Sequence, residues 1–168
     1  MLTVRATKKL LDRLGPPTLQ ENEESTTLLG DWYATAWSWR PQVALFVNER
    51  TLLPVVMPLA PAATLTARFS RQVAAVLAAH GTAQTIIDAE VAQMRDIRLA
   101  KTANRSVAGI MTDFTHLAEV YRDDTPTPDL LSIALFLAKT PCSPLYSKHT
   151  SPDRELAALL GATPPART

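Results

Sequence analysis

The spacing of hydrophobic and polar positions changes several times along the chain, and each change predicts a different element. Residues 2–6 alternate between apolar and polar side chains, which predicts a short strand. Residues 8–14 have helical spacing and precede Gly15 and two prolines, which predicts a helix that starts directly after the strand. The polar and acidic segment 16–27 predicts a solvated loop.

The next part of the chain predicts a meander of strands joined by short turns. Alternating or apolar runs cover residues 32–39, 43–47 and 53–59. Pro54 and Pro58 lie in the third run, and a proline has no N–H group to donate to a neighbouring strand. We therefore predict that the third strand forms an edge of the sheet and that the first strand lies further inside it.

The second half of the chain has mostly helical spacing. One alternating run, residues 97–101, predicts a further strand between two helices. The segments Thr127-Pro128-Asp129 and Ser151-Pro152-Asp153 predict helix starts with proline at the first helical position. The helices are predicted over residues 65–80, 82–94, 107–121, 128–138 and 152–160.

The order of these elements predicts the fold class. Strands come early and helices late, which is typical of an α+β fold rather than a doubly wound parallel sheet. We expect a single domain over residues 1–162, with an antiparallel or mixed sheet and helices packed mainly on one face. Residues 163–168 are expected to form a flexible tail.

Composition excludes several classes of protein. A hydrophobic content of 46% excludes a disordered chain, and a single cysteine excludes a disulfide framework or a cysteine-rich zinc site. The 17 Lys and Arg against 16 Asp and Glu give a net charge of +1, which excludes a strongly basic nucleic-acid coat but not a local basic patch. Without a secretory signal or membrane-spanning segment, we expect a cytoplasmic protein with no membrane partner.

The most informative polar segment lies between the predicted strand 97–101 and the next helix. Asn104 or Ser106 would cap the helix, Thr102 lies beside them, and Lys101 and Arg105 add positive charge. The N–H groups at a helix start and nearby cations attract anions, so this segment predicts a pocket for a phosphate or carboxylate. The alternative is an ordinary capped helix with solvated basic residues.

The helix start after the first strand repeats this pattern with Lys8 and Lys9. If the two strands that precede these helix starts are parallel neighbours, both helices begin at the same end of the sheet. Lys8, Lys9, Lys101 and Arg105 would then converge on one site. The alternative is two unrelated helix starts on the surface.

Other candidate groups have weaker sequence contexts. Asp113, on the helix that follows the basic segment, is a candidate catalytic acid or base, with a structural ion pair as the alternative. Cys142 is a candidate nucleophile with His116 or His149, against the commoner role of a small buried side chain. No metal-binding histidine motif, P-loop or dinucleotide-binding glycine motif occurs, so we expect no metal and no cofactor.

Four stretches of the sequence together resemble a known family. They are residues 5–11 (RATKKLL), 30–34 (GDWYA), 45–54 (LFVNERTLLP) and 101–114 (KTANRSVAGIMTDF). The chain resembles an uncharacterised bacterial family known only as a domain of unknown function, and the resemblance covers most of residues 2–140. It implies no activity, but it singles out Lys8, Asn104, Arg105, Ser106 and Asp113 as residues of interest.

Three hypotheses for function remain open at this point. The first is a small binding module with a basic pocket at a helix start for a phosphate-bearing ligand, either a nucleotide or a nucleic acid. The second is a phosphoryl-transfer or nuclease-like enzyme that uses Arg105, Lys101 and Asp113. The third is an interaction domain or homodimer that uses the edge strand 53–59 and the hairpin that carries Trp32, Trp37 and Trp39, which form either a stacking surface or core packing.

Overall fold

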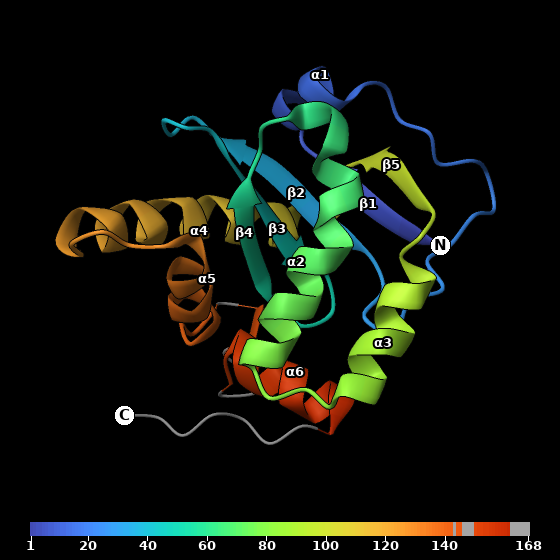
Figure 1. Cartoon of the computed structure of the whole chain (residues 1–168). Helices are drawn as coiled ribbons and strands as arrows, with labels where there is room; N and C mark the ends of the chain where they lie inside the picture. Colours follow the sequence, from blue (N-terminus) through green and yellow to red (C-terminus); the bar gives the residue numbers. More distant parts are fainter. Residues whose placement is uncertain (143, 146–149, 162–168) are drawn as a thin grey trace.

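Five strands form one mixed sheet in the order β4-β3-β2-β1-β5 (Figure 1). The computed structural model describes residues 1–142, 144–145 and 150–161, so the expected tail over 163–168 lies outside the described residues. The strands are β1 (Leu2–Ala6), β2 (Trp32–Trp37), β3 (Val43–Asn48), β4 (Pro54–Pro58) and β5 (Ile97–Lys101).

The pairing of the strands confirms two expectations. Strand β1 is parallel to both β2 and β5, with Val4 opposite Trp32 on one side and Leu99 on the other. Strands β2, β3 and β4 pair antiparallel and place β4 at the edge, as its two prolines predicted. The two strands that precede the basic helix starts are therefore parallel neighbours.

The helices follow the predicted order along the chain. They are α1 (Lys8–Leu14), α2 (Leu65–Ala79), α3 (Gln84–Gln93), α4 (Arg105–Asp124), α5 (Leu130–Ala138) and α6 (Pro152–Leu160), with a 3-10 turn at Ala62–Thr64. Within the described residues, no helix combines the length and apolar character needed to cross a membrane.

The expected start of α5 at Pro128 is wrong. Asp129 is the N-cap residue instead, because its carboxylate accepts a hydrogen bond from the backbone N–H of Ser132 at 2.6 Å. Pro152 does occupy the first turn of α6, as the sequence predicted.

One face of the sheet carries four of the helices. Helices α1, α2, α3 and α6 contribute buried or partly buried side chains to a core that includes Val4, Trp32 and Phe46. Phe69 of α2 packs edge-on against Trp32, with ring centroids 5.3 Å apart, and stacks on Phe46 at 4.0 Å. The α+β fold is thereby confirmed, and Figure 1 shows α2 in front of the sheet.

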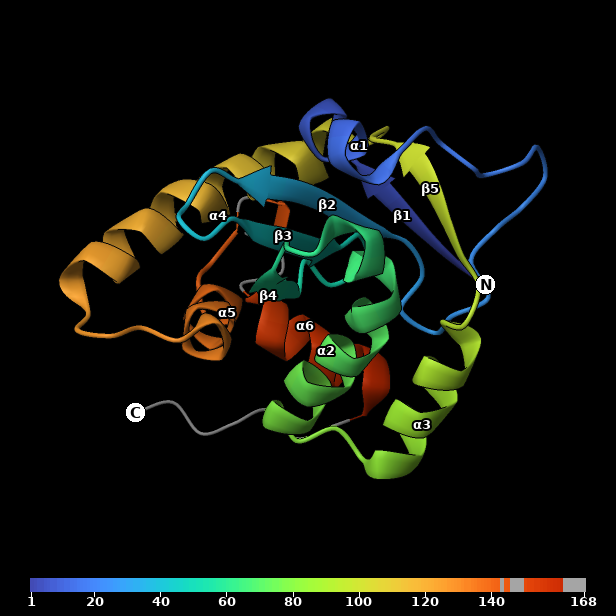
Figure 2. The same cartoon turned by 45° about the horizontal axis from the view of Figure 1, so that its top comes forward.

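The opposite face is covered by α4. Its apolar stripe, which includes Val107, Met111 and Phe114, packs against a second core with Tyr33 and Leu45 from the sheet. In Figure 2, α4 lies on the far side of the sheet from α2. The helices are therefore gathered mainly on one face, with α4 as the long exception.

Helix α5 covers the edge of the sheet at β4. Its residues belong to both cores, since Ala138 packs in the first and Ile133 and Leu137 in the second. Four of the five residues of β4 are buried. A covering helix is one way in which proteins protect an edge strand from pairing with another chain. A partner strand would have to displace α5 to reach the edge at 53–59.

The turn between β3 and β4 is held by the buried amide of Asn48. Its Oδ1 accepts hydrogen bonds from the backbone N–H groups of Arg50 and Thr51 at 3.1 and 3.0 Å and from the Thr51 hydroxyl at 3.0 Å. Its Nδ2 donates to the carbonyl oxygens of Leu29 at 2.9 Å and Asp31 at 3.3 Å. This one side chain therefore fixes the turn against the segment that leads into β2.

Candidate functional site

The helices that follow β1 and β5 leave the sheet toward opposite faces. Lys8 begins α1 directly after β1, and Arg105 begins α4 after β5. In open sheets with parallel strands, such a divergence leaves a crevice at the carboxyl ends of the strands, where ligands commonly bind. Figure 2 shows the carboxyl end of β2 beside α4, with α1 above it.

A cavity of about 520 Å³ lies at this position, and we name it the carboxyl-end crevice. Its walls come from the first turn of α1, the second half of β2 with its turn into β3, and the second half of α4. The lining residues are Lys9, Thr35, Ala36, Trp37, Ser38, Trp39, Arg40, Thr115, Glu119 and Arg122.

The charges of the crevice are mostly positive. Lys9, Arg40 and Arg122 face a single carboxylate in its lining, that of Glu119. Lys9 donates a hydrogen bond to the Ser38 hydroxyl at 2.6 Å, and within the described residues neither Lys9 nor Arg40 forms an ion pair. Arg122 lies 3.6 Å from the Asp123 carboxylate, so Lys9 and Arg40 are the two cations of the crevice without an ion-pair partner in the described residues.

The floor of the crevice is aromatic. The rings of Trp37 and Trp39 lie 4.6 Å apart between centroids, and the Arg122 guanidinium lies 4.2 Å from the Trp39 centroid. The Trp37 indole N–H donates to the Thr115 hydroxyl at 2.8 Å, which fixes the orientation of the ring. Trp37 is buried and Trp39 is half-buried, so the pair is both core packing and the surface of a cavity.

The second basic helix start is built differently. The Asn104 side chain caps α4, because its Oδ1 accepts hydrogen bonds from the backbone N–H groups of Ser106 at 2.9 Å and Val107 at 3.3 Å. The backbone N–H of Asn104 donates to the Tyr33 hydroxyl at 2.9 Å. These N–H groups are therefore already occupied, which leaves fewer donors for an anion at this helix start.

The basic residues of the two helix starts do not meet. Lys101 and Arg105 are exposed and do not line the carboxyl-end crevice. Lys8 does not line the crevice and lies 3.5 Å from Asp12 on the surface of α1. Thr102 is half-buried and Ser106 is exposed at the α4 start. Of the four predicted cations, Lys9 alone lines the crevice.

A polar network lies beside the α4 start. Arg5 forms an ion pair with Asp31 at 2.9 Å, and its Nη1 donates to the Lys101 carbonyl at 3.4 Å. The Ser25 hydroxyl donates to Asp31 at 2.6 Å, and the Asn104 amide contacts Glu49 at 3.5 Å. A cavity of about 290 Å³ adjoins this network. Segments from all four stretches that carry the family resemblance are joined here through one ion pair and several hydrogen bonds.

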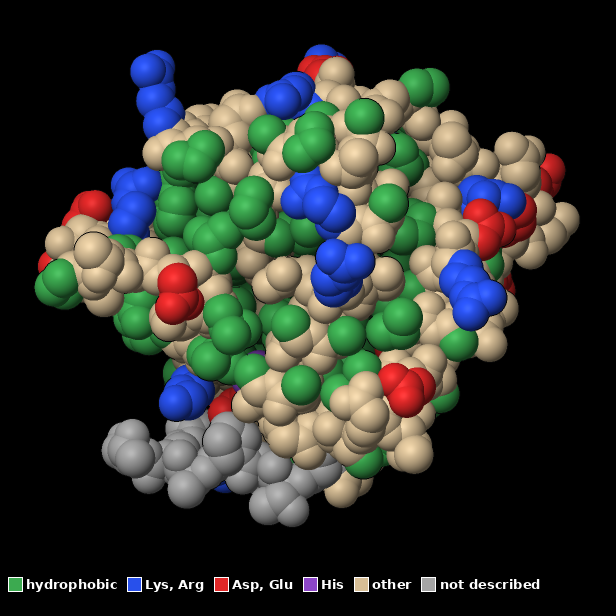
Figure 3. Space-filling view, viewed as in Figure 1, with side chains coloured by type: hydrophobic (Ala, Val, Ile, Leu, Met, Phe, Trp, Pro, Cys, Tyr) green, Lys and Arg blue, Asp and Glu red, His purple; other side chains and the backbone are tan. Residues whose placement is uncertain are grey.

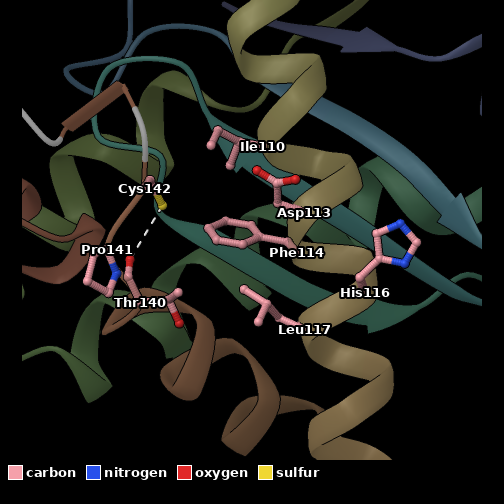
Figure 4. Close-up of a pocket in the computed structure, with 8 residues that line it drawn as sticks. All are labelled: Ile110, Asp113, Phe114, His116, Leu117, Thr140, Pro141 and Cys142. Atoms are coloured by element: carbon pink, nitrogen blue, oxygen red, sulfur yellow. Dashed lines mark hydrogen bonds between the residues drawn. The ribbon is translucent and has the colours of Figure 1, made fainter.

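Asp113 lines a different cavity, of about 420 Å³, between α4 and the segment that follows α5 (Figure 4). Eight residues of helix separate it from Arg105, a rise of about 12 Å along the axis. The structure thus does not bring Asp113 to the basic helix start, and a site that combines it with Lys101 and Arg105 is not assembled.

Cys142 and His116 do not form a nucleophilic pair in the cavity beside Asp113. In Figure 4 His116 projects from the opposite side of α4, away from Cys142. Burial and the charge of Asp113 raise the pKa of the Cys142 thiol to about 11, and the thiol donates to the Thr140 carbonyl at 3.4 Å. The thiol is therefore protonated at neutral pH and is a poor nucleophile. His149 lies outside the described residues.

Sequence reasoning missed most of the crevice. Thr115, Glu119 and Arg122 follow each other at i, i+4 and i+7 on α4, so helical spacing alone places them on one side of the helix. Nothing in the sequence indicates that Arg40, in a turn, and Lys9, on another helix, face this side. In the described part of the chain, no group of three or more His, Cys, Asp or Glu residues is arranged to hold a metal ion.

Comparison with known protein families identifies the chain. Residues 3–155 match the family described as Domain of unknown function (DUF6933). The chain belongs to this family. No curated protein matches it. Membership in the DUF6933 family confirms the resemblance seen in the four sequence stretches, and both α4 and the crevice lie within the matched residues.

Proposed function

We propose that the protein is a small binding module that holds a phosphate-bearing ligand in the carboxyl-end crevice. One observation carries this proposal: Lys9, Arg40 and Arg122 converge on a cavity in which the lining provides one carboxylate, Glu119. Arg122 pairs with Asp123, whereas Lys9 and Arg40 form no ion pair in the described residues, and a bound anion would relieve the repulsion between these neighbouring cations. Hydrogen bonds between charged groups each contribute about 1.5–3 kcal/mol, which favours a phosphate with several oxygens.

The lining of the crevice favours binding over catalysis. No histidine or cysteine lines it, and Glu119 is its one carboxylate. General acid–base catalysis of phosphoryl transfer commonly requires a positioned base beside the phosphate and a group that activates the attacking oxygen. The candidate acid of the enzyme hypothesis, Asp113, lines another cavity.

Calorimetric titration with inorganic tripolyphosphate at low ionic strength tests the proposal. Trp37 and Trp39 line the crevice, so their fluorescence should change on binding. Lys9→Ala and Arg40→Ala should each weaken binding by about three- to tenfold. Lys8→Ala is the matched control, because Lys8 is the neighbouring lysine on the same helix but lies outside the crevice.

Two results would contradict the proposal. One is wild-type protein that does not bind tripolyphosphate at low salt. The other is an equal loss of affinity in Lys8→Ala and Lys9→Ala, which would mean that the anion responds to net charge rather than to the crevice.

A further inference from the structure

A second cavity, of about 300 Å³, adjoins the carboxyl-end crevice. Trp39, Arg40 and Arg122 line both, which places the two spaces next to each other at these side chains. We name this second space the apolar cavity. Volumes of about 300–1,000 Å³ are typical of sites for small molecules.

The walls of the apolar cavity are mostly hydrophobic and rigid. Beyond the shared residues they comprise six apolar residues and one polar one, which are Pro41, Val43, Pro58, Pro128, Leu130 and Ile133 together with Gln42. Proline rings and β-branched side chains have few alternative conformations, so these walls have a fixed shape. A rigid ligand loses little conformational entropy in such a cavity, whereas a flexible acyl chain loses more.

The residues shared by the two cavities suit a ring that is joined to an anion. Arg40 and Arg122 carry planar guanidinium groups, which pair with phosphate oxygens along their edge and stack on flat rings with their face. The Arg122 guanidinium already lies over the Trp39 ring, which contacts Trp37 at an angle of 30° between the ring planes. A ligand ring can extend this stack, because nucleobases stack on guanidinium planes as well as on aromatic rings.

We infer that the phosphate-bearing ligand is a free nucleotide, whose phosphates bind in the carboxyl-end crevice and whose base occupies the apolar cavity. This inference rests on the proposed function. The two adjoining cavities together match a charged group connected to a compact, largely apolar ring. Figure 3 shows most Lys and Arg side chains scattered over the face that carries α2, with hydrophobic and uncharged ones between them and two groups side by side near the centre, so this face has no long basic stripe for a nucleic-acid backbone.

A ligand series on the wild-type protein tests the inference first. Tripolyphosphate carries at least as much negative charge as a nucleoside triphosphate. Electrostatics alone therefore predicts no gain in affinity from the nucleoside, a difference that we call the nucleoside gain. We expect ATP, GTP, CTP or UTP, whichever binds most tightly, to bind at least tenfold more tightly than tripolyphosphate. Ribose 5-phosphate, dodecyl phosphate and a ten-nucleotide oligothymidylate should show no comparable gain.

A pair of variants then locates the base. Leu130→Trp fills the apolar cavity and should remove the nucleoside gain while tripolyphosphate binding stays unchanged. Leu135→Trp is the matched control, since Leu135 lies on the same helix, is also half-buried and does not line the cavity. Circular dichroism and thermal unfolding verify that both variants fold. If Leu130→Trp does not fold, the wild-type series decides alone.

The outcomes separate the two proposals. Equal affinity for tripolyphosphate and every nucleotide overturns the inference and leaves the proposed function intact. Tighter binding of dodecyl phosphate or of the oligonucleotide than of any nucleotide also overturns the inference, in favour of an amphiphile or a nucleic acid. A nucleoside gain that survives in a folded Leu130→Trp variant overturns the placement of the base. If no phosphate compound binds, both proposals fail.

Discussion

The two strand-to-helix junctions of this protein look alike in sequence and differ in structure. Both follow parallel neighbouring strands, and both carry two basic residues, Lys8 and Lys9 in one and Lys101 and Arg105 in the other. At the second junction the Asn104 side chain and the Tyr33 hydroxyl take the hydrogen bonds of the helix start. At the first, no side chain caps α1, and Lys9 lines a cavity with Arg40, neither of which forms an ion pair in the described residues.

Under the proposed function, a basic helix start would become an anion site only when other elements complete it. The N–H groups of a helix start bind an anion only where no cap already occupies them. Lys9 is a candidate ligand-binding residue because Arg40, in the turn after β2, and Arg122, near the end of α4, line the same cavity. Lys101 and Arg105 do not line this crevice, although they are exposed in the same way as Lys9 and Arg40.

The largest expected effect compares matched double variants of the two junctions. Lys9→Ala with Arg40→Ala should weaken tripolyphosphate binding by about ten- to a hundredfold, because two charge-assisted contacts are lost and each single variant is expected to lose about three- to tenfold. Lys101→Ala with Arg105→Ala removes the same net charge and should change the affinity less than about twofold. Titration calorimetry measures both. Similar losses in the two double variants would contradict the distinction between the junctions.

The next largest effect is expected on protein stability, at the residues that precede the two helix starts. Asn104→Ala should lower the free energy of unfolding by about 1–2 kcal/mol, because α4 loses the acceptor for two backbone N–H groups. Asn104→Ser, which keeps a capping side chain, should recover most of this loss. Thr7→Val removes a hydroxyl that forms a hydrogen bond with Thr35 at 3.0 Å but caps no N–H group. We therefore expect about half the loss in free energy of unfolding that Asn104→Ala causes.

Urea denaturation monitored by circular dichroism measures these differences. An equal or larger loss of stability in Thr7→Val than in Asn104→Ala would show that the α1 junction is also held by its threonine side chain. The comparison between a capped and an uncapped helix start would then be wrong.

A smaller effect is expected at Tyr33. Tyr33→Phe removes the hydroxyl that accepts the backbone N–H of Asn104, which should cost about 1 kcal/mol of stability. Because Tyr33 lies outside the lining of the carboxyl-end crevice, tripolyphosphate affinity should stay the same. Thermal unfolding and calorimetry on the same sample check both parts. A loss of anion affinity would connect the α4 start to the binding site.

The smallest effect is expected at Lys8. Lys8→Ala breaks an exposed pair with Asp12 one turn along α1, and such pairs contribute about 0.2–0.5 kcal/mol in isolated helices. We expect a change in the free energy of unfolding within about 0.3 kcal/mol, which disappears at high salt. Urea denaturation at two salt concentrations measures this change. A larger, salt-independent loss would mean that Lys8 has a buried role at the first junction.

Part of the candidate site was accessible from the sequence and part was not. Lys9, Trp37 and Trp39 were identified because basic residues at a helix start and aromatic residues on a strand are local patterns. Arg40 and Arg122 carry no local signal, since their role depends on how a turn and the end of a helix meet. The Asn104 cap was predicted, but its consequence for anion binding requires knowing which N–H groups it occupies.

The sequence by itself determined the order of the elements, the edge position of β4 and the family. These features follow from local spacing, from the missing N–H groups of Pro54 and Pro58, and from motifs that are contiguous in the chain. Only the tertiary structure decided that α4 packs on the opposite face of the sheet from most of the other helices and that α5 covers the β4 edge. It also decided that Lys9, Arg40 and Arg122 share one cavity. Such features depend on packing between distant segments, which local spacing does not encode.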